Sequence, residues 1–132
     1  MTRFNRFLSS TGVLIAAAWL STGALALDES DFKFDTTEDL YQVCSADGAG
    51  EGVTEARLAC RAFIEATVQY HDAVSDRKKM KRLICYPGTA TIADGRDAFV
   101  AWGAKHKGDS ERMSEMPVVG LVRALAEAYP CK

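Results

Sequence analysis

The sequence predicts an all-α fold, a small disulfide-stapled bundle of about four helices. Apolar residues recur at steps of three and four along several segments, which is the period of a helix with one buried face. Strand-like alternation of apolar and polar residues is almost absent. Four cysteines follow an N-terminal leader and are expected to form two disulfides. They are Cys44, Cys60, Cys85 and Cys131.

Residues 1–26 have the features of a secretory signal peptide. Two arginines precede an apolar stretch at 13–20, and Ala26 ends a small-x-small cleavage motif. The stretch is shorter than the roughly 20 apolar residues of a spanning helix, although an uncleaved anchor is the alternative. We expect cleavage between Ala26 and Leu27, a periplasmic or secreted mature chain, and no stable membrane insertion.

The mature chain has the length of one domain and a mild negative charge. The whole chain carries −2 at pH 7, and the leader removes two arginines and no acid, which leaves −4. This charge argues against nucleic-acid binding. We expect residues 27–35 to be a mobile acidic segment unless Phe32 and Phe34 pack on the core, and residues 36–132 to form a single domain.

Two helices are expected in the first half of the mature chain. Asp35 and Glu38 have the spacing of a capping box at the start of a short helix, which ends before a glycine-rich stretch. A second, longer helix is expected over about 54–75 or beyond, because apolar residues recur along it at helical steps. Its buried face comprises Ala56, Ala59, Cys60, Phe63, Thr67, Tyr70 and Val74.

The third helix follows a Pro-Gly break in the chain. Thr91 with Asp94 gives a second capping signature at its start. Trp102 shares a side of this helix with other apolar residues, so we expect it in the core. Gly95 and Gly103 are expected to weaken the helix.

The fourth helix is expected to begin near Pro117, because proline suits the first turn of a helix. Pro130 ends it. Its apolar stripe comprises Val118, Leu121, Val122, Leu125 and Tyr129.

The disulfide pairing is open at the level of sequence, because four cysteines allow three connectivities. Pairing Cys60 with Cys85 would place the third helix parallel to the second and return Cys131 to Cys44. Pairing Cys44 with Cys60, and Cys85 with Cys131, would give an up-and-down bundle. A zinc site is not expected, because the cysteines lack the close spacing of zinc ligands.

The sequence shows no catalytic, cofactor-binding or metal-binding motif, so we expect a protein that is not an enzyme. His71 and His106 belong to no catalytic signature and are expected to be solvated surface residues. Paired cysteines would leave no thiolate to act as a nucleophile.

Two charged segments are candidates for binding a partner. The first is a basic run consisting of Arg77, Lys78, Lys79, Lys81 and Arg82. Such a run could bind an acidic partner or a lipid headgroup, or simply interact with the dipole at a helix end. The second is an acidic connection, which could dock a protein or pack as an ordinary loop. Its candidates are Asp109, Glu111, Met113 and Glu115.

Several short motifs follow one another in a distinctive order. They are Leu40 with Cys44, Ala59-Cys60-Arg61-Ala62-Phe63-Ile64, Cys85-Tyr86-Pro87-Gly88, Leu121-Val122-Arg123-Ala124-Leu125 and Tyr129-Pro130-Cys131. In this order, over roughly residues 36–131, the chain resembles the Rap/Tai-type immunity proteins of bacterial type VI secretion. The resemblance implies a small periplasmic helical protein, often a homodimer, that binds and blocks a peptidoglycan-cleaving amidase effector.

A stand-alone periplasmic stress or acid chaperone-like protein is the alternative function. Its motivation is the large number of carboxylates, whose protonation at low pH would change the charge and expose apolar faces. An enzyme is a third hypothesis, which a convergent polar pocket holding a metal or substrate would support.

Overall fold

The computed structural model describes residues 29–132, so the expected signal peptide lies outside the described part. Within that part the chain forms five α-helices and no strand, which confirms the all-α prediction. The short fourth helix was not predicted. The elements are η1 (Glu29–Phe32, a 3-10 helix), α1 (Thr37–Ser45), α2 (Val53–Lys78), α3 (Ile92–His106), α4 (Ser110–Met113) and α5 (Pro117–Ala128).

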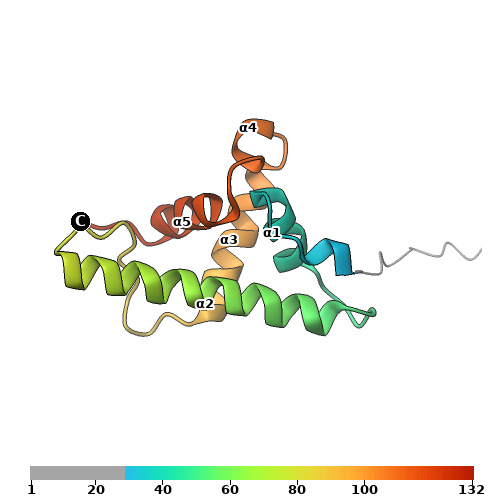
Figure 1. Ribbon diagram of the computed structural model, residues 1–132, viewed down its shortest axis with the longest axis horizontal. Coiled ribbons are helices and arrows are strands. Elements are labelled where there is room, and N and C mark those ends of the chain that lie inside the picture. The colour runs from blue at the N-terminus through green and yellow to red at the C-terminus, as the bar shows by residue number, and fades with distance from the viewer. Residues whose placement is uncertain (1–28) are drawn as a thin grey trace, which may run out of the picture.

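The long helix α2 forms the base of the molecule (Figure 1). In Figure 1, α1 lies over the N-terminal half of α2 and α5 over its C-terminal half, while α3 runs across α2. The helices are therefore not the aligned up-and-down bundle that one disulfide pairing suggested. The short helix α4 sits beyond the far end of α3, away from the C-terminal end of α2.

Capping boxes begin two of the helices. Thr91 accepts a hydrogen bond from the backbone N–H of Asp94 at 3.2 Å and donates its own N–H to that carboxylate at 2.7 Å, as predicted. At α1 the predicted pair is wrong by one residue. Thr36 is the N-cap, and its N–H donates to the carboxylate of Asp39 at 2.8 Å. The short Asp39 side chain makes the return bond that was expected of Glu38.

The core gathers side chains from all five α-helices and from the segment between α2 and α3. Trp102 is 4% exposed, so its predicted place in the core is confirmed. Phe32 and Phe34 also pack on the core, and the ring of Phe34 meets that of Phe63 edge-on with centroids 5.5 Å apart. The buried members are Leu40, Val43, Cys44, Ala56, Cys60, Ile64, Ile84, Phe99, Trp102, Met113, Leu121, Ala124 and Leu125.

Two glycines allow α1 to approach its neighbours closely. A Cβ at Gly103 of α3 would lie 2.3 Å from Cδ2 of Tyr41, and a Cβ at Gly120 of α5 would lie 2.2 Å from Cγ2 of Thr37. Both distances are far inside van der Waals contact. From the sequence, Gly103 was interpreted only as a residue that weakens the helix. In the structure, its lack of a side chain leaves room for the ring of Tyr41.

The disulfides join Cys44 to Cys60 and Cys85 to Cys131. Of the two pairings that the sequence left open, the one with Cys60 bonded to Cys85 is wrong. The first bond ties α1 to α2 and is buried, with both cysteines at most 1% exposed. The second ties the segment before α3 to the C-terminal residues and reaches the surface, because Cys85 is exposed.

Candidate functional site

The chain turns back sharply where α2 ends. Lys79 has a φ of 50°, a left-handed conformation that reverses the chain direction, and the N–H of Met80 donates to the carbonyl of Ser75 at 3.1 Å. Residues 79–86, which we call the return loop, then run back beside the last turns of α2. Near the end of the loop, Cys85 forms its disulfide, and its N–H donates to the carbonyl of Tyr129 at 2.9 Å.

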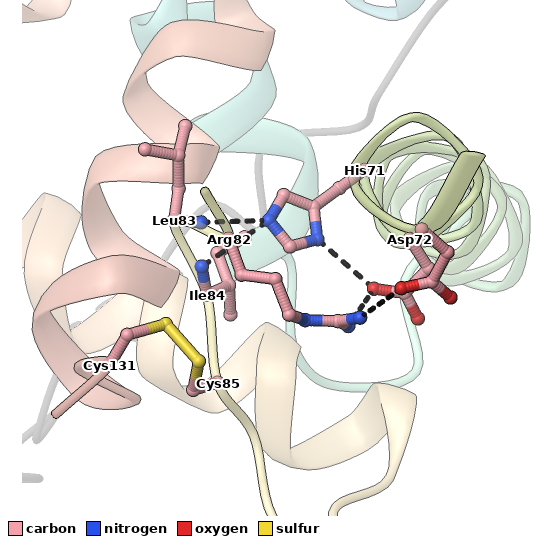
Figure 2. The surroundings of a disulfide bond; sticks show 8 residues. His71, Asp72, Arg82, Leu83, Ile84, Cys85 and Cys131 are labelled. Atoms are coloured by element: carbon pink, nitrogen blue, oxygen red, sulfur yellow. Dashed lines mark hydrogen bonds and ion pairs between the residues drawn. A yellow bond between two sulfur atoms is a disulfide. The ribbon is translucent and has the colours of Figure 1, made fainter. Parts of the chain in front are cut away.

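His71 holds the return loop against α2 (Figure 2). Its Nε2 accepts the backbone N–H groups of Leu83 at 3.1 Å and Ile84 at 3.3 Å. Nε2 must therefore carry a lone pair, so the ring proton sits on Nδ1, which faces Oδ1 of Asp72 at 3.0 Å. The side chain is 8% exposed, so the prediction of a solvated His71 is wrong. Sequence spacing carried no sign of these contacts.

Asp72 is the centre of a polar cluster that braces the loop. Its carboxylate receives the guanidinium of Arg82, the hydroxyl of Tyr86 and the ring N–H of His71, and Arg82 also reaches Asp76 at 2.9 Å. Burial alone would raise the pKa of Asp72, but the hydrogen bonds from Tyr86 and His71 outweigh it. The charge of Arg82 adds to them, so the pKa of Asp72 is lowered. Burial, and then the bond to Asp72, raises the pKa of Tyr86.

Asp72 makes stability depend on pH in a predictable direction. Because its pKa is lowered from the ordinary 3.8 in the folded state, its contribution is complete above that value and is lost as pH falls through the folded value. We expect Asp72→Asn to lower the free energy of unfolding by about 1–2 kcal/mol at pH 7 and by less at pH 3. Urea unfolding at both pH values measures this. Glu111→Gln is the control at an exposed carboxylate, and equal losses for Asp72→Asn at both pH values would contradict the assignment.

An open apolar groove of about 460 Å³ lies between α2, the return loop and α5. We call it the α2–α5 groove. Large apolar side chains along it remain exposed: Tyr70 by 73%, Leu83 by 58%, Met80 by 57% and Val118 by 40%. Apolar side chains gathered at the surface in this way are typical of interaction sites. The lining residues are Phe63, Ala66, Thr67, Tyr70, His71, Val74, Ser75, Met80, Lys81, Leu83, Val118 and Val122.

One residue of the predicted basic run lines this groove. Lys81 lines the groove, and Arg77 and Lys79 are exposed close by in sequence. Arg82 instead turns inward to the carboxylates of α2, so it braces the loop. The side chain of Lys78 lies outside the described part of the structure.

The predicted acidic candidates lie elsewhere, and most have internal roles. Asp109 caps α4 by accepting the N–H of Arg112 at 3.2 Å, and Glu115 forms two bonds with Arg123 at 2.8 and 2.9 Å. Met113 is 4% exposed, so its prediction as a docking side chain is wrong. It belongs to the core because α4 folds back onto α1 and α3. Glu111 is exposed.

Comparison with known proteins decides the family. The model of the Rap1a immunity proteins matches residues 36–131. The chain belongs to the Rap1a immunity protein family. The matched range begins at the N-cap of α1 and includes all five α-helices and both disulfides. No curated protein matches the chain, and no solved structure does.

His106 also makes contacts within the fold. Its Nδ1 atom lies 2.8 Å from the carbonyl of Trp102, and its ring packs against that indole with centroids 4.4 Å apart and planes tilted by 30°. The expectation that His106 is merely solvated is therefore also wrong. Within residues 29–132 no group of His, Cys, Asp or Glu could hold a metal ion, and no helix is long and apolar enough to cross a membrane.

Proposed function

We propose that the protein is a periplasmic immunity protein of type VI secretion that binds and occludes a peptidoglycan-cleaving amidase effector. The match to the Rap1a immunity proteins over residues 36–131 is the observation that carries this proposal. Two disulfides suit an oxidising compartment, which supports the periplasm. The amidase follows from the resemblance to the Rap/Tai-type proteins, as does a homodimer, which sedimentation of the mature chain would test.

Inhibition in this proposal is steric and needs no turnover. The polar cluster around Asp72 uses its groups to hold the return loop. The cysteines of the described chain are all in disulfides, so none supplies a nucleophile. A stable inhibitory complex should bury about 1,200–2,000 Å² of surface in total.

Protection of cells tests the function. The gene of an immunity protein is expected beside that of its effector, so the probe is the peptidoglycan amidase that this proposal expects at the same locus, directed to the periplasm of a sensitive host. We expect the full chain to restore growth, a variant lacking residues 1–26 to give no protection, and the purified mature chain to inhibit the amidase in proportion to the complex formed. Neither protection nor a complex would contradict the proposal.

The acid-chaperone alternative receives no support from the family match. An immunity protein should not prevent aggregation of an unfolded client at acid pH. Light scattering of a reduced, unfolded client at pH 3, with and without the mature chain, distinguishes the two functions.

A further inference from the structure

We propose that the α2–α5 groove is the surface that holds the partner, and that it takes an apolar segment flanked by carboxylates. This inference rests on the proposed function, because it names the part of the effector that the immunity protein would grip. It is carried by the groove's apolar lining, by the charge along its edge and by the fixed position of the return loop.

The size of the groove suits a single segment of protein. Its lining residues on α2 extend from Phe63 to Ser75, a rise of about 18 Å at 1.5 Å per residue. That length accommodates about three turns of helix or five to six extended residues. Met80 and Leu83 form one wall from the return loop, and Val118 and Val122 form the other from α5.

The edge of the groove is positive on a protein that is negative as a whole. Lys81 lines the groove, and Arg77 and Lys79 are exposed close by in sequence, while the carboxylates Asp72 and Asp76 are both paired with Arg82. The complete chain, in contrast, carries −2. These cations attract an acidic partner to this edge. Charge complementarity of this kind steers encounter and selects the partner.

The same charges argue against a second copy of this chain as the occupant. A two-fold dimer brings identical patches together, so groove-to-groove pairing would place two copies of the cations Lys79 and Lys81 in one interface. Uncompensated contacts between like charges cost affinity.

The return loop is already fixed in position before a partner binds. Its backbone is held by His71 at Leu83 and Ile84, the side chain of Ile84 is fully buried, and the disulfide closes its end. Little of its conformational freedom remains to be lost on binding. A preorganised wall therefore retains more of the contact energy as affinity.

Matched substitutions and two peptide probes test the proposal. One 12-residue peptide carries Leu at helical spacing with Glu between, and the other has Lys in place of every Glu. We expect calorimetry to show that the mature chain binds the Glu peptide at least tenfold more tightly than the Lys peptide. Leu83→Asp should weaken that binding at least tenfold, whereas Leu58→Asp, at a side chain 62% exposed and outside the groove lining, should change it less than twofold.

Binding to the amidase that the proposed function expects at the same locus provides a second measurement with the same variants. Leu83→Asp and the Lys79→Glu, Lys81→Glu double variant should each weaken the complex at least tenfold, with Lys107→Glu as the exposed charge control. Met80→Ala should weaken both complexes, and it keeps the test valid if Leu83→Asp fails to fold.

Specific outcomes overturn the inference. The inference is wrong if the Glu peptide does not bind, if both peptides bind equally, or if Leu83→Asp and Leu58→Asp lose the same amount of affinity for the Glu peptide. Leu83-dependent binding only to phosphatidylglycerol vesicles would assign the groove to a membrane, and Leu83-dependent dimerisation alone would assign it to a second copy. If the Glu peptide binds as expected but no amidase complex forms, the proposed function is refuted. The inference that the groove binds an apolar segment flanked by carboxylates is then retained.

Discussion

Replacing Cys85 and Cys131 together by alanine is expected to lower the free energy of unfolding by about 4 kcal/mol. This disulfide closes a loop with a sequence separation of 46, so it restricts the unfolded chain more than the other disulfide, whose separation is 16. By the same loop-entropy relation, removing Cys44–Cys60 costs about 3 kcal/mol before any loss of packing. Urea unfolding of both double variants measures the two losses.

The exposed position of this disulfide permits a check without mutation. Cys85 is exposed, whereas Cys44 and Cys60 lie in the core, and thiol–disulfide exchange requires access to sulfur. We expect brief treatment of the folded protein with dithiothreitol to open Cys85–Cys131 first, as seen by alkylation and mass spectrometry. Loss of less than 1 kcal/mol in the double variant would contradict the stabilising role, and earlier opening of the buried bond would contradict the accessibility argument.

Gly120→Ala is expected to lower the free energy of unfolding by about 3 kcal/mol, within the upper range for overpacked cores. The new Cβ would lie 2.2 Å from Cγ2 and 2.9 Å from Cβ of Thr37, so rotation of the side chain cannot relieve the contact. Thr37 is fully buried, and its hydroxyl donates to the carbonyl of Glu115 at 3.1 Å or that of Met116 at 3.2 Å. Moving α1 away from α5 would break these bonds.

Gly95→Ala is the matched control within a helix. Its Cβ would meet Ile64 at 3.4 Å and Leu125 at 3.7 Å, which is ordinary contact. Alanine also favours the helix over glycine by about 1 kcal/mol, so we expect Gly95→Ala to be neutral or stabilising. Thermal and urea unfolding compare the two variants. Equal stability of Gly120→Ala and Gly95→Ala would show that α1 can shift without cost.

Local chemistry in the sequence was sufficient to locate the main helices. The apolar period predicted a helix from about 54 to 75 or beyond, and α2 spans Val53–Lys78. Thr91 with Asp94 correctly marked the start of α3, and Pro117 that of α5. The α1 cap was predicted one residue too early because adjacent Asp35 and Thr36 are both good capping residues. Only the geometry of Asp39 distinguishes them.

The candidate site was predicted only in part. The basic run was identified from its charge, and one of its residues, Lys81, lines the groove. Tyr70 was assigned to a buried helix face, yet it is 73% exposed. The core face of α2 runs through Ala56, Cys60 and Ile64, and Tyr70 lies instead among the residues that line the groove. The bracing roles of His71 and Tyr86 could not be read from spacing, because each contacts a residue brought close by the reversal at Lys79.

The sequence by itself determined the helical class, the positions of the long helices and the presence of four cysteines to pair, because these depend on residues within a few turns of one another. The tertiary structure decided which cysteines pair, where α1 crosses its neighbours and which apolar residues stay exposed. Those features depend on the path of the return loop and on the close approach at Gly103 and Gly120. Contacts between residues far apart in the chain leave no periodic trace in it, so folding has to bring them together before they can be recognised.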